Sequence, residues 1–151
     1  MKPKCIGIIG GAGPLAGAFL LERILYLSGN IYGCYRDADF PKVILISFPF
    51  TEMLCPNMDI AKIQLELGEC LAQLRTNGAS VLAIACNTLH AFLDPNDQAN
   101  DLVHLPRTLA ENLVLNEPPL VFCTSTSARF GLHKQFLPCR YPEAGAQEEI
   151  D

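Results

Sequence analysis

Short apolar runs alternate with longer amphipathic segments along this chain, which is the pattern of strands and helices in turn. Four runs rich in Ile, Val, Leu and Ala have strand length, at residues 5–9, 43–48, 81–85 and 102–105. Apolar strands of this kind, separated by helical segments, predict a parallel sheet covered on both faces. The fold class expected is α/β, a three-layer α/β/α domain on a parallel sheet.

One helical segment has clear start and stop signals, and another has a start signal. In residues 59–77 the apolar positions follow a 3.6-residue period, with Asp59 as N-cap and Gly78 as the residue after the helix. The first helix is expected to begin at Pro14. The apolar residues that follow the helical period in residues 59–77 are Ile60, Ile63, Leu67, Leu71 and Leu74. Those predicted broadly on one side of the first helix are Leu15, Phe19, Ile24 and Leu27.

The pattern changes after a third helix expected over 106–115. Asn116–Pro119 is typical of a linker, and Leu120–Cys123 predicts a fifth strand followed by hydroxyl residues, then a helix over 128–136. We therefore expect a first domain at residues 1–115 and, at 116–151, the beginning of a second, incomplete α/β domain.

The most informative stretch is Val81–His90, in which the apolar strand stops on Cys86. Asn87 and Thr88 follow at once, and both are helix-capping residue types. Ligands of parallel sheets bind outside the carboxyl ends of the strands. Cys86 is thus a candidate reactive thiolate, with Asn87 and Thr88 placed to hold a carboxylate; the alternative is a cysteine that only packs. His90 either orients the thiol or is a packed histidine.

A glycine turn, Gly10–Pro14, follows the first strand. Glycines let backbone N–H groups approach an anion closely. The spacing is one residue too long for a dinucleotide fingerprint, and no acidic residue follows the second strand to bind a ribose. The loop 50–58 carries Thr51, Glu52 and Cys55, and it either folds over a site or is a surface connection.

Composition and charge limit the classes of molecule that the protein is expected to bind. The net charge of −5 argues against binding to nucleic acid or anionic membranes, and no apolar run is long enough to span a bilayer. Seven cysteines without a C-x-x-C pair argue against a zinc site or a disulfide framework. The glycine-rich start does not resemble a signal peptide, so we expect a cytoplasmic protein.

Three stretches together resemble the aspartate/glutamate racemase superfamily, the amino-acid racemases that use no cofactor. Ile6–Pro14 is similar to the opening G-G-M-G-P motif, with Ala12 in place of Met. Ala85–His90 is similar to the first catalytic-cysteine motif. Cys123–His133 is similar to the second-domain motif L-G-T-x-x-T, with Cys123 in place of glycine.

The resemblance implies two α/β domains with an active site between them, and a role for each matched residue. Cys86 would be the first acid/base thiol. Asn87 and Thr88 would bind the substrate α-carboxylate with Thr124 and the glycine loop, Gly11 and Gly13. The substrate would be a small acidic amino acid or dicarboxylate, with neither cofactor nor metal, and we expect a homo-oligomer, a dimer.

One departure from the family's motifs bears on whether the chain is catalytically active. The family's second thiol lies in a G-C-T-E motif that is absent from these residues. The chain is therefore expected to be a racemase, active or inactive as this short chain, or a non-catalytic carboxylate-binding homologue. A sister activity on the same fold is a further alternative: hydantoin racemase, maleate isomerase or arylmalonate decarboxylase. Cys123 is the alternative candidate for a second acid/base.

Overall fold

A computed structural model describes residues 5–94 and 100–150 of the chain. Within them, strands β1 (Ile6–Gly10), β2 (Val43–Ser47), β3 (Val81–Ile84) and β4 (Leu102–Val103) form one sheet in the order β2-β1-β3-β4. All of the paired strands are parallel. The expected α/β class and parallel sheet are confirmed.

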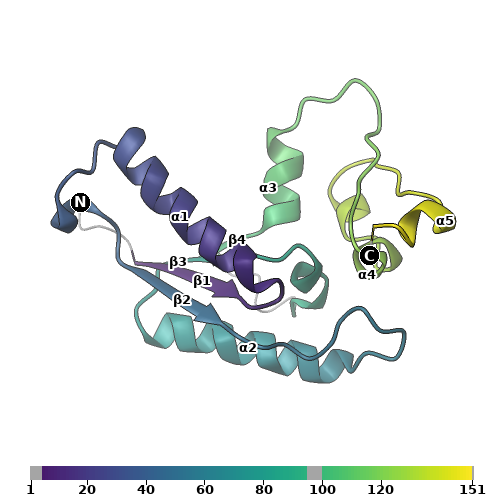
Figure 1. Cartoon of the computed structure of the whole chain (residues 1–151), viewed down its shortest axis with the longest axis horizontal. Coiled ribbons are helices and arrows are strands. Elements are labelled where there is room, and N and C mark those ends of the chain that lie inside the picture. The colour runs from purple at the N-terminus through teal and green to yellow at the C-terminus, as the bar shows by residue number, and fades with distance from the viewer. Residues whose placement is uncertain (1–4, 95–99, 151) are drawn as a thin grey trace.

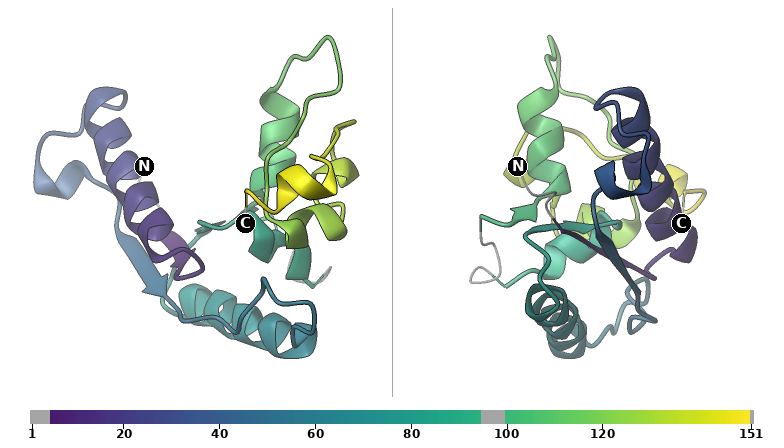
Figure 2. Two further views of the ribbon diagram at one scale, coloured as in Figure 1. Left: turned by 45° about the vertical axis from the view of Figure 1, so that its right-hand side comes forward. Right: turned by 90° about the vertical axis from the view of Figure 1, so that its left-hand side faces the viewer.

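Two long helices cover the sheet, α1 (Pro14–Asn30) on one face and α2 (Ile60–Thr76) on the other (Figure 1). The later helices are shorter: α3 (Leu105–Asn112), α4 (Ser125–Arg129) and α5 (Ala144–Gln147). They lie together beyond one end of the sheet (Figure 2). Three 3-10 helices complete the described elements, at Asp37–Asp39, Thr88–Phe92 and His133–Gln135.

Helix α2 supplies most of the core, as its periodicity predicts. The Asp59 carboxylate accepts a hydrogen bond from the Lys62 N–H at 3.0 Å, which confirms the predicted N-cap. The buried face consists of Ile63, Leu67, Cys70, Leu71 and Leu74, all at most 2% exposed. Ile60 was expected on this face but is 40% exposed, because it stands at the first position of the helix.

Helix α1 presents a different face to the sheet from the predicted one. A Cβ on Gly17 would lie 3.1 Å from the Gly10 Cα, so the helix touches the strand backbone through these glycines. This contact turns Gly17 and Ser28 inward and leaves Ile24 and Leu27 half-buried. Leu15 and Phe19, predicted on the same side of the helix as Ile24 and Leu27, are 83% and 61% exposed. The apolar spacing had identified the helix but not its orientation.

The segment after α3 is less regular than expected. The predicted fifth strand is reduced to one parallel bridge between Leu120 and Arg140. The helix predicted over 128–136 is instead α4 and the 3-10 helix His133–Gln135, separated by Gly131 with a φ of 60°. Helix α3 ends at Asn112, three residues before the predicted end. The boundary between residues 115 and 116 stays a prediction.

Several apolar side chains remain exposed on α1 and after it, among them Leu15, Phe19, Ile31, Tyr32 and Tyr35. The expected dimer stays a prediction. No helix in the described part of the chain is both long and apolar enough to cross a membrane.

Gly11 allows the closest backbone approach in the structure. Its φ is +103°, and a Cβ there would overlap the Phe48 carbonyl oxygen. Gly13 also has a positive φ, of +78°, but a Cβ would meet nothing within 4 Å. The two glycines therefore separate the effect of steric overlap from the effect of left-handed backbone strain.

Gly11→Ala should lower the free energy of unfolding by roughly 3 kcal/mol, because it adds both overlap and strain. Gly13→Ala adds strain alone and should cost roughly 1 kcal/mol. Urea denaturation of both variants checks this. Equal losses would show that the contact with Phe48 relaxes freely.

His90 anchors the turn after β3 from inside the protein. Its Nδ1–H donates to the Cys86 carbonyl oxygen at 2.8 Å, and its Nε2 accepts from the Leu105 N–H at 3.2 Å. The ring packs edge-on against His104, with 4.8 Å between centroids. Burial lowers the pKa of His90 to about 4. The neutral ring is the form that makes both hydrogen bonds.

The stability of the protein should therefore fall in acid through His90. The folded pKa of about 4 lies below the ordinary 6.5, so the unfolded chain takes up a proton first as the pH falls. Between about pH 7.5 and pH 5 the loss through this group should be about 2 kcal/mol. Burial also lowers the pKa of His104 and His133, which add to the slope in the same direction.

The contribution of His90 is the difference in this pH dependence between wild type and His90→Gln, measured by urea denaturation at both pH values. Glutamine retains a donor and an acceptor without titrating. An identical slope in the two proteins would contradict the assignment.

Candidate active site

The carboxyl ends of β1, β2 and β3 meet at one edge of the sheet because the three strands are parallel and in register. Gly10 is level with Ser47, and Ile9 with Ile84. The segments that follow these strands enclose a cavity of about 400 Å³. Its lining residues are Gly11, Ala12, Gly13, Pro49, Phe50, Thr51, Glu52, Met53, Leu54, Cys86, Thr88 and Thr124.

Five of the six residues predicted from the sequence line this cavity. They are Cys86, Gly11, Gly13, Thr88 and Thr124. The sixth, Asn87, is exposed and is not among the lining residues. Its side chain also makes no capping hydrogen bond to the 3-10 helix that follows. The structure thus brings the predicted thiol, glycine loop and two hydroxyls together without Asn87.

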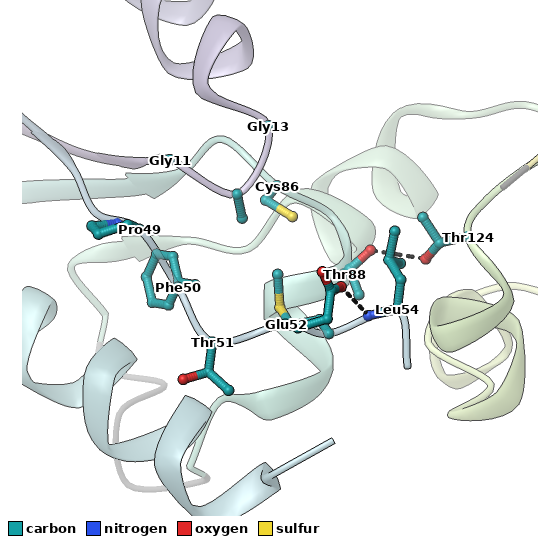
Figure 3. A pocket seen from close by; sticks show the side chains of 12 residues that line it. Gly11, Gly13, Pro49, Phe50, Thr51, Glu52, Leu54, Cys86, Thr88 and Thr124 are labelled. Carbon is teal, nitrogen blue, oxygen red and sulfur yellow. Dashed lines mark hydrogen bonds between the residues drawn. The ribbon is translucent and has the colours of Figure 1, made fainter. Parts of the chain in front are cut away.

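Cys86 stands at the end of β3, half-buried, with its thiol in the space between the glycine loop and Thr88 (Figure 3). Its backbone is fixed through the hydrogen bond that its carbonyl accepts from His90. From the sequence, His90 was expected either to orient the thiol or to be a packed histidine. Both of its ring nitrogens bond to backbone atoms, so it holds the turn rather than the thiol.

A cluster of three hydroxyls closes the cavity opposite the sheet. The Thr88 Oγ1 lies 3.0 Å from the Thr124 Oγ1 and 3.1 Å from the Ser127 Oγ. The Thr124 hydroxyl donates to the Ser127 Oγ at 3.1 Å. Each oxygen is thus within hydrogen-bond distance of the other two. Since Thr88 follows β3 and the other two belong to α4 and its cap, the cluster joins the segment after α3 to the sheet.

The segment between β2 and α2, the loop 50–58, forms one wall of the cavity. The sequence alone was compatible with a loop over a site or with a surface connection. Thr51 is held by α2: its N–H and hydroxyl donate to the two carboxylate oxygens of Glu66, at 2.9 and 2.8 Å. From the other side, the buried Thr126 hydroxyl donates to the Met53 carbonyl at 2.7 Å. The loop 50–58 therefore folds over the cavity and is fixed at two points.

Glu52 and its apolar neighbours Phe50, Met53 and Leu54 are lining residues that sequence reasoning did not assign. The available signal was positional, because they follow a strand that ends at the same edge as Cys86. Among the residues that line the cavity, Cys86 is the single described thiol. Cys123 is half-buried outside the lining, and its carbonyl accepts a hydrogen bond from the Gln147 side chain at 2.7 Å.

The described residues contain no group of three or more His, Cys, Asp or Glu side chains placed to hold a metal ion. Besides the Glu52 carboxylate, the cavity offers a thiol, hydroxyl donors and the glycine loop. These groups suit an anionic ligand beside a group that transfers protons.

Comparisons with known proteins were made by sequence and by structure. No family model matches the chain. Over 94 residues it is 24% identical to a broad-specificity amino-acid racemase, RacX, of Bacillus subtilis (strain 168). The match covers 62% of this chain and 41% of that racemase, so the chain corresponds to less than half of its relative.

Solved structures share the fold over nearly the whole chain. An aspartate racemase homologue from Pyrococcus horikoshii OT3 matches with a TM-score of 0.72 and 22% identity, covering 99% of this chain and 68% of the other. The aspartate racemase of Picrophilus torridus has a TM-score of 0.72 and 17% identity, over 97% and 65%. The glutamate racemase of Thermus thermophilus has a TM-score of 0.67 and 15% identity, over 93% and 50%.

The motifs, the sequence match to an amino-acid racemase and the structural matches agree with one another. The chain thus has the fold of the aspartate and glutamate racemases, and its sequence is similar to that of an amino-acid racemase, in agreement with the resemblance stated from the motifs.

Proposed function

We propose that this protein is a cofactor-independent amino-acid racemase of the aspartate/glutamate type, with Cys86 as an acid/base at Cα. The observation that carries the proposal is that the Cys86 thiol, the glycine loop and the two threonine hydroxyls line one cavity. The relative RacX is described as a broad-specificity amino-acid racemase, which supports an amino acid as the substrate.

The substrate α-carboxylate would lie against Thr88 and Thr124. Both hydroxyls belong to the lining, and a hydroxyl that turns toward a carboxylate makes a charge-assisted hydrogen bond. Backbone N–H groups of the Gly11–Gly13 turn would add donors from the other side. With the carboxylate fixed between them, Cα is presented to the cavity beside Cys86.

Proton transfer would then proceed at Cα. The Cys86 thiolate takes the Cα proton, and the electron pair left on Cα is delocalised into the carboxylate, which the hydroxyls stabilise. Inversion requires that a proton return from the opposite face, whereas return from the Cys86 thiol restores the original enantiomer. With one described thiol in the lining, this chain should exchange the Cα proton of one enantiomer faster than it inverts it.

The experiment that tests the proposal follows loss of the Cα–H signal by NMR in deuterium oxide. Each enantiomer of a panel of amino acids is incubated with the 151-residue chain. We expect exchange from one enantiomer of at least one amino acid with little inversion. Cys86→Ser should lower the exchange rate at least ~100-fold, since a hydroxyl is a far weaker base than a thiolate.

Cys34→Ser is the matched control, because Cys34 is also half-buried but lies outside the lining of this cavity, in the connection before β2. It should leave the rate unchanged. Exchange that survives in Cys86→Ser would overturn the proposal. Binding without exchange in wild type would instead favour the non-catalytic carboxylate-binding homologue.

Thr88→Val tests the carboxylate site, since it removes one hydroxyl while nearly preserving the shape of the side chain. The amino-acid concentration that half-protects Cys86 from iodoacetamide should rise about tenfold, because a donor to a charged group is lost. Thr76→Val, at an exposed position at the end of α2, should not change it. Equal protection in Thr88→Val and wild type would remove Thr88 from the site.

A further inference from the structure

The charges around the cavity are unbalanced. Of its described lining residues, Glu52 is the single charged one, and none is Lys, Arg or His. The Glu52 side chain points from its loop toward the side of the cavity where Thr88 lies (Figure 3). A ligand in this cavity therefore meets hydroxyl and backbone donors at one place and a carboxylate at another.

Glu52 is held in this position rather than free on a flexible loop. Its neighbours Thr51 and Met53 are fixed by Glu66 and Thr126, from α2 and α4. The Glu52 Oε1 accepts a hydrogen bond from the Leu54 N–H at 2.7 Å. No described residue donates a hydrogen bond to the other carboxylate oxygen, which is thus available to a ligand.

The arginine on the far side of this loop belongs to another hollow. Arg129 lines a neighbouring cavity with Leu54, Cys55, Pro56, Ser125 and Thr126. Its guanidinium donates to the Pro56 carbonyl at 3.5 Å and lies over the Phe130 ring, 5.3 Å from the centroid. It is not among the residues that line the cavity of Cys86.

We propose that Glu52 determines side-chain specificity and that the preferred substrates are amino acids with a basic side chain rather than an acidic one. This inference rests on the proposed function, because it assigns the α-carboxylate to Thr88 and Thr124. With the carboxylate there, a side-chain ammonium group pairs with Glu52, whereas a second carboxylate is repelled by it. The apolar walls, Pro49, Phe50 and Met53, receive the methylene stem of such a side chain.

The experiment measures how well lysine, norleucine and glutamate protect Cys86 from iodoacetamide, in wild type and in Glu52→Gln. Norleucine has the aliphatic stem of lysine without its charge. We expect the order lysine, norleucine, glutamate in wild type. In Glu52→Gln the preference for lysine over glutamate should fall about fivefold, the size expected when one solvent-exposed charge acts on both ligands.

Two features separate a charge effect from a structural one. The preference in wild type should be weaker at ~0.5 M than at ~0.05 M salt, because exposed charges are screened. Glu69→Gln, which removes an exposed carboxylate of α2 outside the cavity, should leave the order and the ratio unchanged.

The other outcomes are distinct. Stronger protection by glutamate than by lysine in wild type would overturn the specificity assignment while leaving the proposed function intact. Equal weakening of lysine and norleucine in Glu52→Gln would place the α-ammonium group on Glu52 and also overturn it. If no amino acid protects Cys86, the proposed function fails, and the inference fails with it.

Discussion

The structure depends on the register of three parallel strands. Because β1 pairs with β2 on one side and β3 on the other, the chain must turn after each of them at the same edge. Three segments far apart in the sequence, at residues 11–13, 49–54 and 86–88, consequently enclose one space. A shift of one residue in β3 would turn the buried Leu82 and Ile84 to the opposite face of the sheet, so their burial fixes the site as well as the core.

The glycines determine how closely these layers approach. The contact between Gly10 and Gly17 brings α1 against the backbone of β1, and Gly11 lets the turn after β1 lie on Phe48. The same restraint explains why the apolar side predicted for α1 is not the side that the helix buries. Apolar periodicity shows which positions of a helix can be buried. In α1, the backbone contact between glycines decides which positions are actually buried. Leu15 and Phe19 have the apolar spacing, but the glycine contact leaves them exposed.

The residues of the candidate site were predictable where a suitable residue type directly follows a strand of the parallel sheet. Cys86 and Thr88 directly follow a buried strand, and the glycine turn follows its neighbour, so parallel pairing suffices to bring them together. Thr124 was inferred from the family motif alone, since its approach to Thr88 depends on packing across 36 residues. The position of the loop 50–58 depends on Glu66 and Thr126, which no local pattern connects to it. Asn87 has the right residue type, but its backbone in the first turn after the strand leaves its side chain in solvent.

The three hydroxyls of Thr88, Thr124 and Ser127 form a closed ring with three protons and three oxygens. With Thr124 donating to Ser127, the ring closes when Ser127 donates to Thr88 and Thr88 to Thr124. In the proposed site, a carboxylate that accepts the protons of Thr88 and Thr124 would open this ring, leaving a chain in which Ser127 donates to Thr88 and Thr88 donates to the ligand. Every proton stays in a hydrogen bond, so the ring-opening sacrifices no donor, and each link of the chain polarises the next. Ser127, fully buried and outside the cavity lining, would thereby contribute to the binding of the proposed ligand without touching it.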